Sequence, residues 1–460
     1  MQNHQRIDGR GFESAKIGAA FALLLVMLWI PENGLRLTEG RIVGSAPSAY
    51  IGDEPHYVLV VHSLLFDRDL NLKNNYASAL RGGWDAGRLW RGRPIAHQTI
   101  LFEPDTGEHA LWLDKCRWKK VDRCWPIDMR TTDALLDQKF PHIGSPVERS
   151  GHPIAFPVVA AAAIAASRPA RNEVEARLGL LMGLIGWLGI VLTYRTGRAI
   201  NLSARSALGA AALLALASAW LPYTRSFYPA TLAGLSLIIA LLSIVKKRIV
   251  MAALAISYAA ALKPILSVVA ISWMIVLLFQ RRWQSASTFG LCVGLCGAAL
   301  GLFNYWTTGT PMVFGVVTPR ASFNTGEALL ATLLSPSYGL IVFVPWAIVG
   351  FIYLARSTTT SGTLTPVGWA SIGIVPILIL LALFPYLGAN CYGPRYWIPF
   401  LPWLAIACAA QFQASNKLAR SCIVILAVAG ALVAIPGTIL YPSVWDRPPH
   451  IALDHLLNRW

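Results

Sequence analysis

Charged residues are scarce in this sequence. They make up 13% of its 460 residues, and 55% of the residues are hydrophobic, whereas roughly a quarter of an ordinary soluble domain is charged. This balance excludes a typical soluble protein and indicates a polytopic membrane protein. The net charge of +16 fits Lys and Arg gathered at cytoplasmic span ends, next to membrane lipids. No basic–aromatic motif for nucleic acid is present, so we expect no nucleic-acid partner.

Acidic residues are almost absent from most of the chain. Between Arg177 and Trp445 the sequence holds one acid, Glu327. Proton- and sodium-coupled transporters usually place Asp or Glu at mid-membrane, so this scarcity argues against ion-coupled transport. It favours a site that receives an anionic headgroup.

A nucleotide-binding motif is missing, and cysteines are few. There is no phosphate-cradling glycine-rich loop such as a P-loop, so nothing points to a nucleotide. Of seven cysteines, Cys116 and Cys124 flank a short polar segment, which predicts a disulfide and an oxidising compartment. A metal pair is the alternative, but no His or Cys lies at a suitable spacing to complete it.

Long apolar runs fill the rest of the chain. There are twelve of them: 17–30, 153–167, 177–194, 207–222, 229–245, 249–262, 264–280, 285–306, 336–355, 367–387, 396–411 and 420–440. If all crossed the membrane from an internal amino terminus, five basic clusters would lie outside, against the positive-inside rule. We therefore interpret 153–167, which is short, rich in alanine and interrupted by Pro157, as an interfacial helix.

This count predicts an all-α membrane protein of about 11 transmembrane helices. Residues 1–30 form the cytoplasmic amino terminus and first span, and 31–176 an external loop with interfacial helices. About ten further helices span 177–440, and 441–460 is an external tail. The external face would belong to the periplasmic side of the cytoplasmic membrane.

Asp53 and Glu54 stand just beyond the first span, in the only long polar stretch. With Pro55 they are typical of a helix start, with Asp53 as N-cap. A carboxylate pair here could also supply a catalytic base, and the two roles are compatible. His56 is either a polar-face residue or a ligand contact.

Three cations fall in loops predicted to share the external face with Asp53. Lys263 either snorkels at a span end or provides a point charge for a phosphate. Arg395 either anchors the interface beside Tyr396 or forks onto phosphate oxygens. Arg320 either pairs with Glu327 or contacts the same anion.

Short motifs recur in order along most of the chain: Asp53 and Glu54 with Tyr57; His152 and Pro153 with Phe156 and Pro157; Asn304 and Tyr305 with 308–311; residues 335–340; and residues 392–396. Together they resemble the GT-C superfamily of integral-membrane glycosyltransferases, especially the branch with protein O-mannosyltransferases and lipid A aminoarabinose transferases. One departure is His152, where that family often carries Lys. A second is the insert at 81–150, which matches no motif of the family.

The resemblance implies an inverting transfer from a polyprenyl-phosphate-linked sugar. Asp53 would be the general base on an acceptor hydroxyl or amine, and Glu54 would orient it or contact the acceptor. The donor phosphate would be held by cationic and tyrosine side chains, namely Lys263, Arg395, Arg320 and Tyr396. The acceptor region would be lined by His56, Tyr57 and His152.

Several points stay open at this stage. The acceptor could be a lipid, a polysaccharide or a protein. No cofactor is required, although the adjacent carboxylates could bind a divalent metal. The main alternative function is a flippase or other transporter of lipid-linked saccharides; an O-antigen ligase or polymerase and a structural scaffold are further alternatives.

The topology is directly testable. Paired reporters, one active only inside and one only outside, are fused near residue 100 and after Trp460. We expect both positions to report outside. Opposite sides would mean that 153–167 crosses or that another run does not, and the shared external site would be lost.

Overall fold

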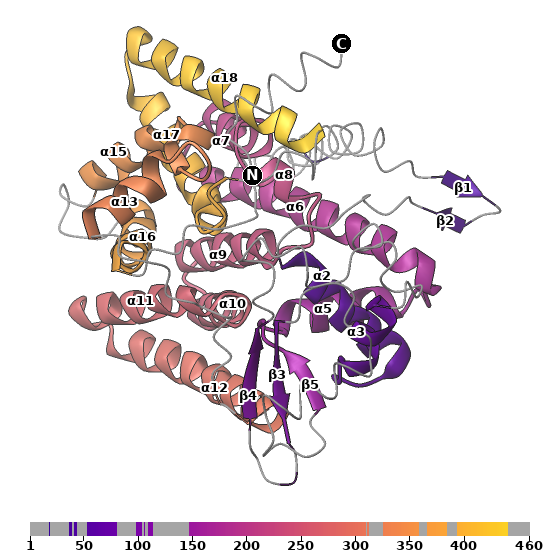
Figure 1. Cartoon of the computed structure of the whole chain (residues 1–460). Coiled ribbons are helices and arrows are strands. Elements are labelled where there is room, and N and C mark those ends of the chain that lie inside the picture. Colours follow the sequence, from indigo (N-terminus) through magenta and orange to yellow (C-terminus); the bar gives the residue numbers. More distant parts are fainter. Residues whose placement is uncertain are drawn as a thin grey trace, which may run out of the picture. The chain divides into compact units, whose positions relative to one another are not determined.

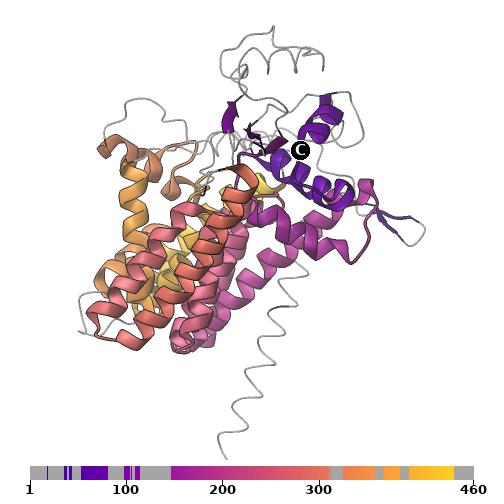
Figure 2. The same cartoon turned by 90° about the horizontal axis from the view of Figure 1, so that it is seen from below.

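The computed structural model describes residues 18, 36–38, 41–43, 53–80, 98–103, 105, 109–113, 147–309, 311, 325–357, 366–383 and 393–439. The chain divides into two compact units. The helical unit comprises Met1–Gly34, Gly179–Cys296 and Pro319–Trp460, and the mixed unit comprises Leu35–Leu178 and Gly297–Thr318. Figures 1 and 2 show the elements of both.

The mixed unit combines short strands with helices. Its elements are β1 (Arg36–Thr38), β2 (Arg41–Val43), α2 (Glu54–His62), the π-helix Ser63–Asp67, α3 (Lys73–Leu80), β3 (Gln98–Phe102), β4 (His109–Leu113), β5 (Val147–Ser150), α5 (Ala155–Ala165), the 3₁₀ turn Arg171–Glu173, the start of α6 (Val174–Ala199) and the end of α12 (Trp283–Thr308). β1 and β2 form an antiparallel pair. In the other sheet β3 is central, with antiparallel neighbours β4 and β5.

Helix α2 is the centre of this unit. Every one of its side chains is buried, and it packs against α5 and α3. At its carboxyl end the buried His62 Nε2 lies 3.5 Å from Glu175 Oε1 in the first turn of α6. Because both partners are buried, this contact fixes the end of α2 against α6.

The helical unit contains the rest of α6 and the start of α12, with a run of further helices. These are α7 (Ala204–Leu216), α8 (Trp220–Tyr223), α9 (Pro229–Val245), α10 (Ile249–Leu262), the 3₁₀ turn Pro264–Leu266, α11 (Ser267–Phe279), α13 (Thr325–Leu334), α14 (Leu340–Phe343), α15 (Ala347–Ser357), α16 (Pro366–Leu383), the 3₁₀ turn Ile398–Phe400, α17 (Leu401–Ala414) and α18 (Lys417–Ile439). Helices α9 and α10 lie side by side in both views (Figures 1 and 2).

The predicted runs 229–245 and 249–262 coincide with α9 and α10. Pro229 opens α9, where its missing N–H costs nothing. Two other runs are broken: 207–222 divides into α7 and α8, and 336–355 into α14 and α15. The first predicted span and the tail at 441–460 lie outside the described residues, apart from Gly18.

Lipid-facing character is clear in the longest helices. Among the described residues three helices are long and apolar enough to cross a membrane: Val174–Ala199, Trp283–Thr308 and Lys417–Thr438. In the second, only 11% of the most apolar window is buried inside the protein, and Leu302 is 70% exposed. Apolar side chains exposed on this scale require lipid around them. The chain is therefore an integral membrane protein, and the count of eleven spans stays a prediction.

Helix α5, the predicted interfacial segment, has 11 residues, so it is about 16 Å long against a hydrocarbon core of about 30 Å. This length is compatible with an interfacial position. Helix α15 is as short, however, and belongs to a predicted span, so length alone does not decide sidedness.

Trp220 is the packing anchor of the helical unit. Its ring is fully buried, and its indole N–H donates to the Gly186 carbonyl (3.2 Å). Gly186 and Gly189 on α6 and Gly234 on α9 form the slot that receives this residue, and a Cβ at Gly189 or Gly234 would overlap the indole ring. Small residues therefore let these helices approach closely.

Substituting Gly189 by alanine should lower the stability of the helical unit by about 1–3 kcal/mol, because the new methyl group collides with the rigid indole. The measurement is the thermal unfolding midpoint of the purified protein in detergent. Gly183→Ala on the same helix is the matched control, since a Cβ there meets nothing within 4 Å. Equal midpoints for the two variants would contradict this account of the packing.

Candidate functional site

The predicted helix start at Asp53 and Glu54 is present. Glu54 is the first residue of α2, Pro55 follows it in the first turn, and the Asp53 carbonyl accepts hydrogen bonds from the His56 and Tyr57 amides at 3.2 and 3.4 Å. The Asp53 side chain, however, makes no capping hydrogen bond. Asp53 is therefore the N-cap residue of α2, as predicted, and it caps the helix through its backbone carbonyl.

The two carboxylates differ in environment. Glu54 is fully buried within the mixed unit, whereas Asp53 is half-buried. The half-buried carboxylate is the one that a substrate can reach without displacing the packing of α2. Of the two, Asp53 is thus the more accessible carboxylate, and its catalytic role stays a prediction.

Three residues predicted to line the site come together beside α2. The rings of His56 and His152 stack, with centroids 5.1 Å apart and an interplanar angle of 28°. The Tyr57 ring tilts against His152 at 5.5 Å. His152 follows β5 in the chain, so one end of this strand meets the first turn of α2.

Two members of this cluster were not predicted as site residues. Tyr76 on α3 places its hydroxyl oxygen 2.6 Å from His56 Nδ1. Phe156, identified in sequence only as part of a motif, packs edge-on against Tyr57, with centroids 5.8 Å apart. No sequence signal marks Tyr76, because its place depends on the packing of α3.

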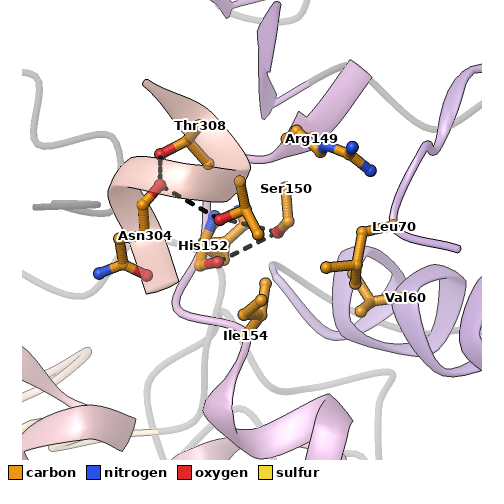
Figure 3. Close-up of a pocket in the computed structure, with 9 residues that line it drawn as sticks. Val60, Leu70, Arg149, Ser150, His152, Ile154, Asn304 and Thr308 are labelled. Carbon is orange, nitrogen blue, oxygen red and sulfur yellow. Dashed lines mark hydrogen bonds between the residues drawn. The ribbon is translucent and has the colours of Figure 1, made fainter. Parts of the chain in front are cut away.

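A small pocket adjoins this cluster in the mixed unit. It is lined by Val60, Leu70, Arg149, Ser150, His152, Ile154, Asn304, Thr307 and Thr308. In Figure 3 the α12 residues Asn304 and Thr308 stand on one side and Val60 and Leu70 on the other, with Ser150 and His152 between them. His152 therefore belongs both to the aromatic cluster and to the pocket wall.

A second group of predicted site residues lies in the helical unit. The Lys263 ammonium donates to the Arg395 carbonyl (3.3 Å) and lies 4.9 Å from the centroid of the Tyr396 ring. The Arg395 guanidinium lies 5.9 Å from that ring and 4.8 Å from the Tyr228 ring. Both cations are buried. The structure thus brings Lys263, Arg395 and Tyr396 into one cluster, although 132 positions separate Lys263 from Arg395.

Chain geometry explains how these cations are held. Lys263 ends α10 in an extended conformation, and Pro264 opens a 3₁₀ turn directly after it. Gly393 has a φ of +54°, and a Cβ there would lie 2.6 Å from the Phe343 ring. Only glycine fits this turn. The Arg395 amide donates to the Gly393 carbonyl (2.9 Å) within this turn. The Arg395 guanidinium then lies over the Tyr228 ring.

Tyr228 is the member of this cluster that sequence reasoning missed. It is fully buried at the N-cap of α9. Its position between the predicted apolar runs 207–222 and 229–245 was the available signal. Three other predicted residues, Arg320, Cys116 and Cys124, lie outside the described residues.

Among the described residues, no group of three or more His, Cys, Asp and Glu side chains is placed to hold a metal ion. Asp53 and Glu54 remain the pair considered for a divalent cation. Their different burial does not favour joint coordination through two open carboxylates.

Comparison with solved structures gives the fold. The crystal structure of ArnT from Cupriavidus metallidurans in the apo state is similar to this chain with a TM-score of 0.50, at 12% identity, covering 96% of this chain and 72% of ArnT. The chain has the fold of ArnT. The predicted fold, a polytopic helical membrane protein, is therefore confirmed.

A second crystal structure, of the same ArnT bound to undecaprenyl phosphate, has a TM-score of 0.46 at 11% identity and covers 95% of this chain and 73% of that one. No family model matches the sequence, and no curated protein matches it. At these identities the likeness shows the fold alone. The five short strands of the mixed unit are an addition to the helical architecture expected from sequence.

Proposed function

We propose that this protein transfers a sugar from a polyprenyl-phosphate-linked donor to an acceptor at the outer face of the cytoplasmic membrane. The observation that carries this proposal is the cluster in which two buried cations, Lys263 and Arg395, share the ring of Tyr396. The fold of ArnT supports it as an analogy of architecture.

Two positive charges gathered on one ring favour an anionic ligand. Each cation gains from the tyrosine quadrupole, by about 0.5–2 kcal/mol, but the two repel each other. A phosphate bridging them would relieve that repulsion and accept charge-assisted hydrogen bonds. The chain between residues 177 and 445 holds only one acid, so its excess of positive charge suits an anionic ligand.

In this mechanism the leaving group is the lipid phosphate. As the bond from the anomeric carbon to the phosphate oxygen breaks, negative charge grows on the phosphate, and Lys263 and Arg395 stabilise it. Arg320 is a further candidate for this role. Tyr396 holds both cations in place and contacts the donor through its hydroxyl.

Asp53 is assigned as the general base. It takes the proton from the acceptor hydroxyl or amine as that atom attacks the anomeric carbon from the opposite side, which inverts the configuration. Glu54 orients this region of α2 from its buried position. No cofactor is assigned. The acceptor can be a lipid, a polysaccharide or a protein.

In the alternative, a flippase or transporter, the same cations bind a lipid-linked saccharide transiently while it crosses the membrane. It predicts that Asp53 is dispensable and that the purified protein transfers no sugar. The two functions thus differ at Asp53, and the first variant below distinguishes them.

Replacing Asp53 by asparagine keeps the shape of the side chain and removes the base. We expect the transfer rate to fall by about 10²–10⁴-fold, measured with membranes, a labelled polyprenyl-phosphate sugar and a mixture of envelope acceptors. Asp105→Asn, at an exposed acid of the mixed unit, should retain full activity. Full transfer by Asp53→Asn at normal expression would exclude Asp53 as the base.

Replacing Arg395 by alanine should weaken use of the donor by about tenfold to a hundredfold in kcat/KM, the range expected for losing a hydrogen bond to a charged group. Dependence on acceptor concentration should change much less. Arg282→Ala, which removes an exposed arginine of the helical unit, is the control. An effect confined to the acceptor would contradict the assignment of Arg395 to the donor phosphate.

A further inference from the structure

The helical unit holds a buried arginine that the proposed mechanism does not use. Arg225 lies just after α8, and its side chain is 6% exposed. Its Nη1 atom donates a hydrogen bond to the Thr438 carbonyl, at the carboxyl end of α18. The last four carbonyls of a helix have no partner within the helix, and the helix dipole makes that end attractive to a cation. Arg225 therefore ties the chain after α8 to the end of α18.

The segment around Arg225 is folded tightly on itself. The Tyr223 carbonyl accepts from the Ser226 hydroxyl (3.3 Å) and the Thr231 hydroxyl (3.2 Å), which joins the segment to the first turn of α9. Both hydroxyl side chains are fully buried. The rings of Tyr223 and Tyr228 lie 5.6 Å apart, measured between centroids. A displacement of Arg225 would therefore also displace Tyr228.

Tyr228 depends on this segment for its position. It is the N-cap residue of α9 and has extended backbone angles, with φ −108° and ψ 144°, so it lies just outside the regular helix. The Arg395 guanidinium lies 4.8 Å from the centroid of its ring. A cation–π contact of this kind requires a separation within about 6 Å. The position of Arg395 is thus sensitive to the segment 224–228.

We propose that Arg225 is a positioning residue for the donor phosphate. By holding the segment 224–228 at the end of α18, it keeps the Tyr228 ring against the guanidinium of Arg395, which binds the phosphate. Arg225 itself makes no contact with the substrate. This inference rests on the proposed function, in which Arg395 is assigned to the donor.

The test is the dissociation constant of undecaprenyl phosphate, measured with the purified full-length protein in detergent. We expect Arg225→Gln to weaken binding about tenfold, because the site is no longer held in its binding geometry. Arg225→Lys keeps a charged donor for the Thr438 carbonyl and should bind within about threefold of wild type. Wild-type affinity in Arg225→Gln would overturn the proposal.

A stability control separates positioning from a general loss of packing. Leu241→Ala removes a buried side chain of α9, about 20 Å along the helix axis from Tyr228. It should lower the thermal unfolding midpoint and leave the affinity for undecaprenyl phosphate unchanged. If Leu241→Ala weakens binding as much as Arg225→Gln does, the effect is one of stability and the proposal fails.

A milder variant decides the matter if Arg225→Gln does not fold. Thr231→Val removes only the hydroxyl that donates to the Tyr223 carbonyl and keeps the shape of the side chain. We expect about threefold weaker binding of undecaprenyl phosphate, the effect of one lost hydrogen bond. Ser236→Ala, which removes a buried hydroxyl further along α9, is the matched control. Equal affinities of these two variants would then overturn the proposal.

A double variant shows whether Arg225 acts through Tyr228. In a Tyr228→Leu background, Arg225→Gln should cause no further loss of affinity, since the ring that it positions is gone. Additive losses would mean that Arg225 acts on the donor by another route, and would overturn the positioning role. In the transfer assay Arg225→Gln should raise the donor KM about tenfold and change the acceptor KM less than about twofold. Equal changes in both would contradict the assignment.

Arg395→Gln is the reference variant that distinguishes this inference from the proposed function. If Arg395→Gln weakens the binding of undecaprenyl phosphate and Arg225→Gln does not, the positioning role fails and the donor site stands. If Arg395→Gln binds undecaprenyl phosphate as wild type does, the proposed function itself fails at its donor site.

Discussion

Burial of positive charge is the constraint on which the candidate site depends. Lys263 and Arg395 are both buried in a segment that holds one acid from residue 177 to 445, and burying a charge is costly unless it is stabilised. Their stabilisation includes tyrosine faces and a backbone carbonyl. These partners attract a cation without neutralising it. A carboxylate in the same place would compete with that phosphate.

This arrangement requires tight packing between segments that are distant in the sequence. Gly393 permits the turn that carries Arg395, because Phe343 occupies the space of any Cβ. The Trp403 indole donates to the Leu237 carbonyl (3.3 Å), which fixes α17, just after Arg395, against α9. Tyr228 opens α9. The cation and the ring that it faces are thus both tied to the same pair of packed helices.

Composition and hydropathy predicted the fold class and most helix positions, because a helix in lipid must be apolar over its whole length. They missed the breaks after Leu216 and Phe343, where tertiary packing interrupts a continuous apolar run. They also missed the strands β3 to β5. The pairing of β3 with β5 joins positions 45 to 51 apart and leaves no local signal, and the hairpin of β3 and β4 lies inside the insert that matched no motif. The site residues divide in the same way, into those marked by local sequence and those placed by packing. Asp53 and Arg395 stand in short sequence signatures, whereas Tyr76, Tyr228 and Arg149 gain their places only through packing.

His152 shows why a departure from the family motif can be physically consistent. The resembling family often carries lysine at this point, where this chain has an imidazole that stacks on His56 and contacts Tyr57. A flat ring can fill that space between aromatic neighbours. A lysine there would bring a permanent charge against His56 and would need its own counter-ion. In this chain a permanent cation stands instead on β5 at Arg149, in the wall of the pocket to which His152 also belongs. The aromatic cluster at the first turn of α2 is therefore built from rings, and the guanidinium of this region lies on β5.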